Sequence, residues 1–197
     1  MPGIQIKSSD RIFITGKTGF GKSFLVKHFL LPRFFRWVVY DYKHEIELPG
    51  AAIFYRLEDF QKQPGQPHII YRPLSGGNEE FNQLCRQVFY RGNTMFVIDE
   101  LAFHCSASMI QPYHDLIMRL GRSKNVGCIN CTQRPVGTHN NILTQTEHFF
   151  IFHVGGNDCK KLSTMLNTEI APKIEQYHFE YFNQSMEHPV LCRPVKA

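Results

Sequence analysis

The stretch Gly16-Lys17-Thr18-Gly19-Phe20-Gly21-Lys22-Ser23 fits the phosphate-binding pattern G-x-x-x-x-G-K-[ST] at every fixed position. Its flanks fit as well. Residues 11–15 predict a short buried strand, and residues 23–31 predict a helix that Pro32 should end. A strand, a glycine-rich turn and a helix are the context in which this pattern holds phosphate. The sequence therefore predicts a phosphate-binding loop.

The residue types of this loop explain how it would hold a nucleotide. Its glycines let the backbone turn so that successive N–H groups point at phosphate oxygens, and the helix N-terminus adds partial positive charge. Lys22 can reach the β- and γ-phosphates, and the Ser23 hydroxyl can bind Mg²⁺. The expected nucleotide-binding residues are Gly16, Lys17, Thr18, Gly19, Phe20, Gly21, Lys22 and Ser23. A glycine-rich turn with a surface lysine is the alternative, which the flanking pattern disfavours.

A pair of carboxylates follows a buried strand further along the chain. Residues 94–98 form an almost continuous apolar run, and Asp99 and Glu100 come directly after it. Such a run is typical of a buried parallel strand, and ligand-binding groups gather at the carboxyl ends of such strands. We expect Asp99 to hold Mg²⁺ together with Ser23, and Glu100 to polarise the attacking water. Two solvated acids at a strand end are the alternative.

Gln133 follows another apolar strand, predicted over residues 126–131. A neutral amide there can hydrogen-bond the γ-phosphate of a nucleotide and report its presence. Taken in isolation, a polar residue in a turn before Pro135 is the simpler interpretation. We therefore name Lys22, Glu100 and Gln133 as candidate catalytic residues on the strength of the whole set.

Strand-like and helix-like segments alternate along the chain, which indicates an α/β fold with a mainly parallel sheet. Further strands are expected at residues 36–41, 52–55, 68–71 and 148–154, further helices at 57–63, 78–90, 112–120 and 157–166, and two short strands or an irregular clasp at 177–191. At 197 residues we expect a single domain, 1–197, with a core of about 11–154 and a C-terminal extension of 155–197.

The composition is ordinary for a soluble globular protein, with 43% hydrophobic and 20% charged residues. No apolar run approaches the ~20 residues of a membrane span, so we expect an intracellular protein with reduced cysteines. The net charge of +5 permits a polyanionic partner without demonstrating one. Cys128 and Cys131 have the spacing of half a zinc ribbon. Residues three apart in a strand face opposite ways, however, so we expect buried free thiols.

The order of these features resembles the FtsK/HerA superfamily of DNA-translocating ATPases. The resemblance is carried by Asp99-Glu100 after one strand, an arginine at position 122, and a strand ending in residues 132–135, Thr-Gln-Arg-Pro. It covers residues 11–154. It implies a RecA/ASCE-like P-loop NTPase fold, which is a three-layer sandwich around a mainly parallel sheet, with ATP and Mg²⁺ as cofactors.

The resemblance also implies a homo-oligomeric ring, a pentamer or hexamer, in which an arginine finger acts on ATP bound to the neighbouring subunit. Arg122 is the expected finger and a candidate catalytic residue, and Arg119 competes with it. A surface arginine at a helix terminus is the alternative for both. Arg134 is expected to have a structural or phosphate-proximal role.

FtsK-type proteins add membrane spans and a DNA-reading winged helix, and HerA adds a β-barrel, none of which we expect in this chain. The compact form resembles the genome-packaging ATPases of tailless, internal-membrane double-stranded DNA viruses. This implies ATP-driven translocation of double-stranded DNA into a preformed capsid, in the host cytoplasm and associated with the virion. A capsid vertex or a membrane-associated protein would be the further partner. The alternatives are a cellular or conjugative DNA translocase and, from another class, a nucleotide-dependent switch or small-molecule kinase.

The residues that would grip DNA are poorly specified. Candidates are His104 and His114, which follow Glu100, and the pair Lys160-Lys161. Ordinary solvated surface is the simpler interpretation for each of them.

Overall fold

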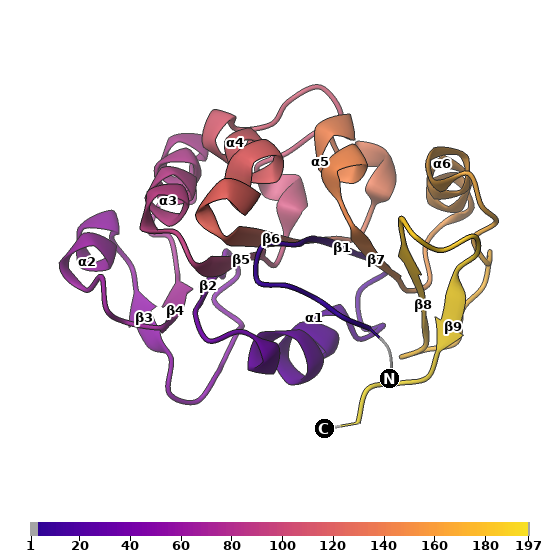
Figure 1. The fold of residues 1–197 in the computed structure, drawn as a ribbon, viewed down its shortest axis with the longest axis horizontal. Coiled ribbons are helices and arrows are strands. Elements are labelled where there is room, and N and C mark those ends of the chain that lie inside the picture. Colours follow the sequence, from indigo (N-terminus) through magenta and orange to yellow (C-terminus); the bar gives the residue numbers. More distant parts are fainter. Residues whose placement is uncertain (1–3, 197) are drawn as a thin grey trace.

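The computed structural model describes residues 4–196. Within them, a nine-stranded sheet has the order β3-β4-β2-β5-β6-β1-β7-β8-β9 (Figure 1). β1 to β7 pair in parallel, whereas β8 and β9 form an antiparallel hairpin at one edge. The strands are β1 (Arg11–Thr15), β2 (Trp37–Tyr40), β3 (Ala52–Phe54), β4 (His68–Tyr71), β5 (Thr94–Ile98), β6 (Val126–Thr132), β7 (His148–Ile151), β8 (Phe179–Asn183) and β9 (Val190–Cys192).

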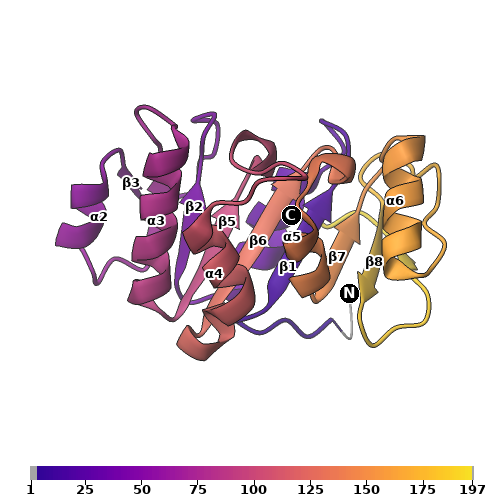
Figure 2. The same ribbon diagram turned by 90° about the horizontal axis from the view of Figure 1, so that it is seen from above.

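Helices cover both faces of the sheet. Figure 1 shows α3, α4 and α5 on one face and α1 on the other, and Figure 2 shows α2, α3, α4, α5 and α6 following one another across the sheet. The helices are α1 (Lys22–Leu25), α2 (Leu57–Lys62), α3 (Asn78–Arg91), α4 (Pro112–Leu120), α5 (Asn140–Gln145) and α6 (Gly156–Leu166). The expected α/β architecture with a mainly parallel sheet and helices on both faces is therefore confirmed.

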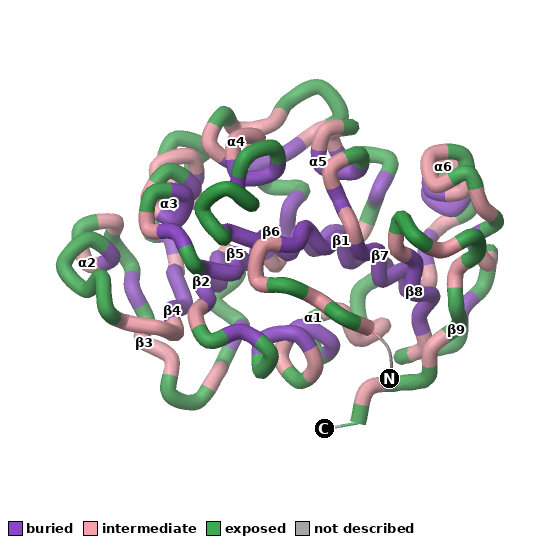
Figure 3. The backbone as a smooth tube through the Cα atoms, in the orientation of Figure 1, coloured by how far each residue is buried: buried purple, intermediate pink, exposed green. Residues whose placement is uncertain are grey.

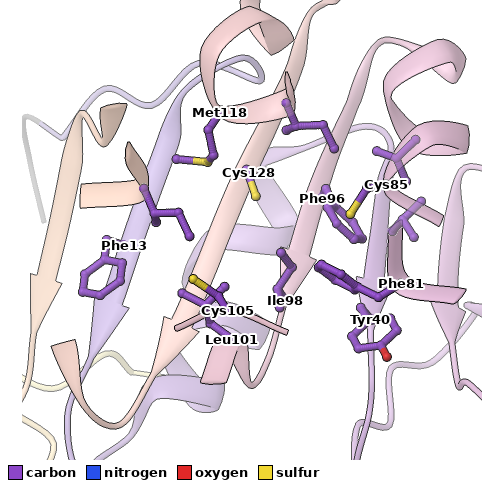
Figure 4. Packing of buried hydrophobic residues seen from close by; sticks show 14 of the residues in the cluster. Phe13, Tyr40, Phe81, Cys85, Phe96, Ile98, Leu101, Cys105, Met118 and Cys128 are labelled. Carbon is purple, nitrogen blue, oxygen red and sulfur yellow. The ribbon is translucent and has the colours of Figure 1, made fainter. Parts of the chain in front are cut away.

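The central strands are buried on both faces, which explains their nearly continuous apolar sequences. In β1, Phe13 packs into the core under α3 and α4, whereas Ile12 and Ile14 pack into the core around α1. Figure 3 shows the strands buried through the middle of the molecule, and Figure 4 shows Phe13, Phe96 and other side chains of the first core packed together. The sheet is thus locked from both sides.

The largest differences from the sequence predictions lie in short helical segments. Pro32 does not end the helix, because α1 continues through a π-helix (Val26–Leu30) into a 3₁₀ turn (Leu31–Arg33) that contains the proline. Proline is tolerated in the first turn of a helical segment, where its missing N–H is not needed. α5 was not predicted, because it is short and lacks apolar periodicity. Its cap is His139, whose ring nitrogen accepts a hydrogen bond from the Asn141 backbone N–H at 3.2 Å.

His104 and His114 are neither solvated surface nor candidates for a DNA contact. Both are buried in the core between the sheet and α3 and α4. His104 Nε2 lies 2.8 Å from the Tyr40 hydroxyl, and His114 Nε2 lies 2.9 Å from Asn130 Oδ1. Burial lowers the pKa of each ring to about 4, so both are neutral core residues at pH 7.

Cys128 and Cys131 point to opposite faces of β6, as predicted. Cys128 belongs to the core that contains Phe13, and Cys131 to the core around α1. Both are free thiols, and burial raises the pKa of Cys128 to about 12. Among residues 4–196 no group of three or more His, Cys, Asp or Glu side chains is arranged to hold a metal ion. Within the same range, the helices are all too short or too polar to cross a bilayer.

Gly127→Ala should destabilise the fold, because a Cβ on this β6 residue would lie 2.5 Å from the Ser8 carbonyl oxygen and 2.8 Å from that of Asp10. These are backbone atoms that cannot rotate away, and overpacking of this kind costs about 1–3 kcal/mol. Gly65→Ala is the matched control, since a Cβ there has no neighbour within 4 Å. Urea denaturation of the two variants measures the difference, and equal midpoints would contradict the packing described.

Candidate active site

The glycine-rich loop lies at the carboxyl edge of the parallel sheet, between the end of β1 and the start of α1. Backbone hydrogen bonds tie it to both neighbouring strands: Gly16 N–H donates to the Thr132 carbonyl at 3.3 Å, and Lys17 N–H donates to the His153 carbonyl at 2.9 Å. Gly16 has a φ of 149°, and a Cβ there would lie 2.5 Å from the Phe152 Cβ. Only glycine fits this position, and the two backbone hydrogen bonds fix the start of the loop against both neighbouring strands.

Lys22, the first residue of α1, directs its ammonium back into the loop. Its Nζ donates hydrogen bonds to the carbonyl oxygens of Gly16 at 2.7 Å and Lys17 at 3.2 Å. Burial lowers the pKa of Lys22, while the nearby carboxylates of Glu100 and Asp99 oppose that effect. The lysine therefore presents a cation inside the turn where phosphate oxygens would lie.

The remaining loop residues form an accessible rim. Lys17, Thr18 and Gly19 are exposed. The Lys17 ammonium lies 3.2 Å from His153 Nε2, and the Phe20 ring lies 5.3 Å from the same imidazole, centroid to centroid. His153 follows β7 at the same edge of the sheet, which is the signal by which the sequence could have marked it as a neighbour of the loop.

Ser23 and Asp99 meet across the gap between α1 and the end of β5. The Ser23 hydroxyl donates a hydrogen bond to Asp99 Oδ1 at 3.3 Å. Burial raises the pKa of Asp99, and the charge of Lys43 acts against that shift. A hydroxyl and a carboxylate at this separation are the oxygen donors that Mg²⁺ prefers, so the residues present fit the ion.

Glu100 contacts two other polar side chains of the site. Its carboxylate is buried, and Oε2 accepts hydrogen bonds from Gln133 Nε2 at 3.0 Å and from Lys43 Nζ at 3.1 Å. The structure thus brings together Glu100 and Gln133, which lie far apart in the sequence. Lys43 was missed, and its position just after the predicted strand of residues 36–41 was the available signal.

Asp41 holds the loop that carries Lys43. This fully buried carboxylate accepts hydrogen bonds from the backbone N–H groups of Glu45 and Ile46, each at 3.0 Å. It also forms an ion pair with Arg72, with 3.0 Å between Nε and Oδ2. Asp41 therefore orders the segment after β2 and sets the direction from which Lys43 reaches Glu100.

Arg122 is not brought to this site. It lies in a 3₁₀ turn (Gly121–Lys124) before β6, at the amino edge of the parallel strands, and its guanidinium pairs with Glu147. Arg11, at the start of β1, shares the same carboxylate at 3.3 Å. Arg119 is paired with Asp115 on α4 at 2.9 Å. The side chains of Arg119 and Arg122 are largely exposed, and their ion-pair partners are Asp115 and Glu147, which do not belong to the loop.

Arg134 and the paired lysines are also placed outside the cluster around Glu100. Arg134 is exposed, and its backbone N–H donates to the Thr132 hydroxyl at 3.3 Å. Lys161 donates to the carbonyl oxygens of Val136 and Thr138, whereas Lys160 is exposed. Lys161 thus fastens the segment after β6 to α6.

No protein-family model matches the chain. A curated relative is the DNA packaging ATPase P9 of Enterobacteria phage PRD1, which is 27% identical over 208 residues, covering 94% of this chain and 87% of that protein.

Among solved structures, the genome packaging NTPase B204 from Sulfolobus turreted icosahedral virus 2, in complex with sulfate, has a TM-score of 0.82 at 19% identity, covering 97% of this chain and 99% of that one. The pCW3 conjugation coupling protein TcpA matches with a TM-score of 0.59 at 16% identity, covering 93% of this chain and 59% of that one. At sequence identities this low, the two structural matches establish that the folds are alike and carry no statement about function. The chain therefore has the P-loop NTPase fold expected from its sequence, and it resembles the DNA packaging ATPase of phage PRD1 along nearly its whole length.

Proposed function

We propose that this chain is a Mg²⁺-dependent ATPase that drives double-stranded DNA into a viral capsid, with residues 1–197 acting as one motor domain. The observation that carries the proposal is the gathering of Lys22, Asp99, Glu100 and Gln133 at one edge of the sheet, around the phosphate-binding loop. The relatives support DNA packaging as the process that the ATPase drives, since P9 and B204 are both named for genome or DNA packaging.

Each residue has a distinct task in hydrolysis. The loop N–H groups and Lys22 hold the β- and γ-phosphates, and Mg²⁺, held by Ser23 and Asp99, would neutralise charge on the phosphate oxygens. Glu100 accepts a proton from the water that attacks the γ-phosphorus, while the bond between that phosphorus and the β–γ bridging oxygen breaks to release ADP. Lys43 and Gln133 both bond Oε2 of this carboxylate, so these two side chains set the orientation of the base.

Gln133 would link the γ-phosphate with the general base, Glu100. Its amide already donates to Glu100, so a turn of this side chain toward a phosphate oxygen would free that carboxylate oxygen. Lys43 forms an ion pair with Glu100, with 3.1 Å between Nζ and Oε2, and this contact holds the carboxylate in position. The site thus couples recognition of the γ-phosphate to activation of water.

Arg122 would complete the site of a neighbouring subunit in a pentameric or hexameric ring. In its own chain it faces away from the loop, on the opposite edge of the strands, and a head-to-tail arrangement brings such opposite edges together. We place this ring in the host cytoplasm and on the virion, at a capsid vertex or beside a membrane-associated protein.

Glu100→Gln should retain ATP binding and lose turnover by about 10²–10⁴-fold, because an amide keeps the shape of the side chain but cannot accept the proton. Glu79→Gln on the outer face of α3 is the control, since that carboxylate is exposed. Steady-state phosphate release and equilibrium binding of ATP measure the two effects separately. Wild-type turnover in Glu100→Gln would show that another group is the base.

Arg122→Ala should bind ATP normally and hydrolyse it about 10³–10⁵-fold more slowly, as expected for loss of an arginine finger. Arg119→Ala, which removes the Asp115 pair on α4, should stay near wild type. Mixing Arg122→Ala with Lys22→Ala protein should restore activity, because mixed rings contain boundaries with both residues intact. Rings shown to be mixed that stay inactive would argue against action on a neighbour.

Double-stranded DNA of any sequence should stimulate the ATPase, because a packaging motor grips phosphates and not bases. Apparent DNA affinity should fall with salt, with a log–log slope of about −0.9 for each phosphate contact. The measurement is ATPase rate against DNA concentration at two salt levels, with random, viral and single-stranded DNA compared. Stimulation by a small metabolite and by no DNA would favour a kinase or switch.

A further inference from the structure

A pocket of about 310 Å³ opens beside the phosphate-binding loop. Its walls come from four parts of the chain: α1, the end of β7, the hairpin strand β8 with the turn before it, and the C-terminal tail. The side chains that line it include Phe24, Phe152, Tyr177, Phe179, Pro194 and Val195. The walls are therefore apolar and largely aromatic.

The pocket begins where the phosphate-binding loop ends. Gly21, the residue before Lys22, lines it, and a Cβ on Gly21 would lie 3.2 Å from Tyr177 Cδ1 and 3.4 Å from Phe152 Cε1. Because Gly21 borders both the loop and the pocket, a ligand whose phosphates lie on the loop can extend its other end into the pocket. A larger cavity, of about 860 Å³, lies between β8, β9 and the tail, and the loop does not border it.

Tyr177 is held over this opening by the segment before β8. The neighbouring Gln176 amide donates a hydrogen bond to the Gly19 carbonyl at 3.1 Å, which fastens the segment to the loop. Tyr177 itself has a φ of 66°, an unfavourable conformation for a bulky residue. Strained residues that persist in a fold cluster at ligand-binding positions. Below, Phe152 and Phe179 pack with their rings 5.2 Å apart and form an apolar floor.

We propose that this pocket receives the nucleobase of the bound nucleoside triphosphate and that Tyr177 stacks on it. The inference rests on the proposed function, since it takes the phosphates to lie on the loop. Aromatic faces stack on every base, because every base has a π-face. The Tyr177 hydroxyl is the only polar side-chain group among the lining residues that the structure describes, so the walls offer little to read a base edge.

This lining has a consequence for substrate choice. Strong discrimination between related substrates comes from buried hydrogen-bonding groups that one substrate leaves unpaired, and apolar walls provide only weak discrimination. The site should therefore accept adenine and guanine nucleotides with affinities within roughly tenfold of each other. The motor would be a nucleoside triphosphatase with little preference between adenine and guanine, with the phosphates supplying most of the affinity.

Calorimetric titration with ATP, GTP and inorganic tripolyphosphate, each with Mg²⁺, tests the assignment. Tyr177→Ala should weaken ATP and GTP about tenfold, as loss of one stacking partner does, and leave tripolyphosphate binding unchanged. Tyr177→Phe should bind all three like wild type, because the ring is retained. Tyr90→Ala, which removes an exposed tyrosine from α3, is the matched control. Phe24→Ala, on the other wall, is a second variant that should lose nucleotide but not tripolyphosphate affinity.

The outcomes separate the pocket from the loop. Equal weakening of ATP and tripolyphosphate in Tyr177→Ala would assign the tyrosine to shaping the loop and overturn the proposal. So would unchanged ATP binding in both Tyr177→Ala and Phe24→Ala, or a preference of wild type for one purine above about 100-fold. Wild-type protein that binds neither ATP nor tripolyphosphate would overturn the ATPase function itself, together with the pocket that depends on it.

Discussion

The fixed position of β1 between β6 and β7 is the constraint on which the rest of the molecule depends. Parallel pairing with both neighbours places the ends of all three strands at one edge, and the backbone bonds from Gly16 and Lys17 then hold the loop against the residues that follow β6 and β7. Because the strands are parallel, every polar group that follows one of them is delivered to the same edge. The glycine-rich loop, Asp99, Glu100 and Gln133 are thus brought together by strand direction.

Burial of both sheet faces makes that edge the natural place for charge. The side chains of the central strands pack into two apolar cores, one under α3 and α4 and one around α1. Along the central strands both faces are buried, so charged side chains reach solvent or one another at the ends of these strands. Glu100 is buried even so, and an unpaired carboxylate in that position would be costly. Its bonds to Lys43 and Gln133 offset that cost, and they join the proposed base to the proposed γ-phosphate reporter.

The two edges of the sheet carry different parts of the proposed motor. The carboxyl edge holds the glycine-rich loop, whereas the amino edge holds Arg122 and Arg11 around Glu147. In the proposed ring, Arg122 on the amino edge would act on the carboxyl-edge site of the next subunit, and such a head-to-tail interface closes into a ring when the rotation permits. The hairpin strands β8 and β9 extend the sheet beyond β7, and β8 and the C-terminal tail supply walls of the pocket beside Gly21. The C-terminal extension thus contributes to the neighbourhood of the site as well as to the sheet.

The amino-acid sequence by itself determined the strands, the long helices, the loop at residues 16–23 and the acids that follow residues 94–98. These features are local: glycine conformations, apolar runs and turn residues are encoded within a few positions of one another. Only the tertiary structure decided that Lys43 reaches Glu100, that His104 and His114 are core residues, that Arg122 lies at the edge away from its own loop, and that Tyr177 stands over Gly21. Each of these depends on segments far apart in the chain, and their proximity follows from strand order and packing, which local sequence patterns do not encode.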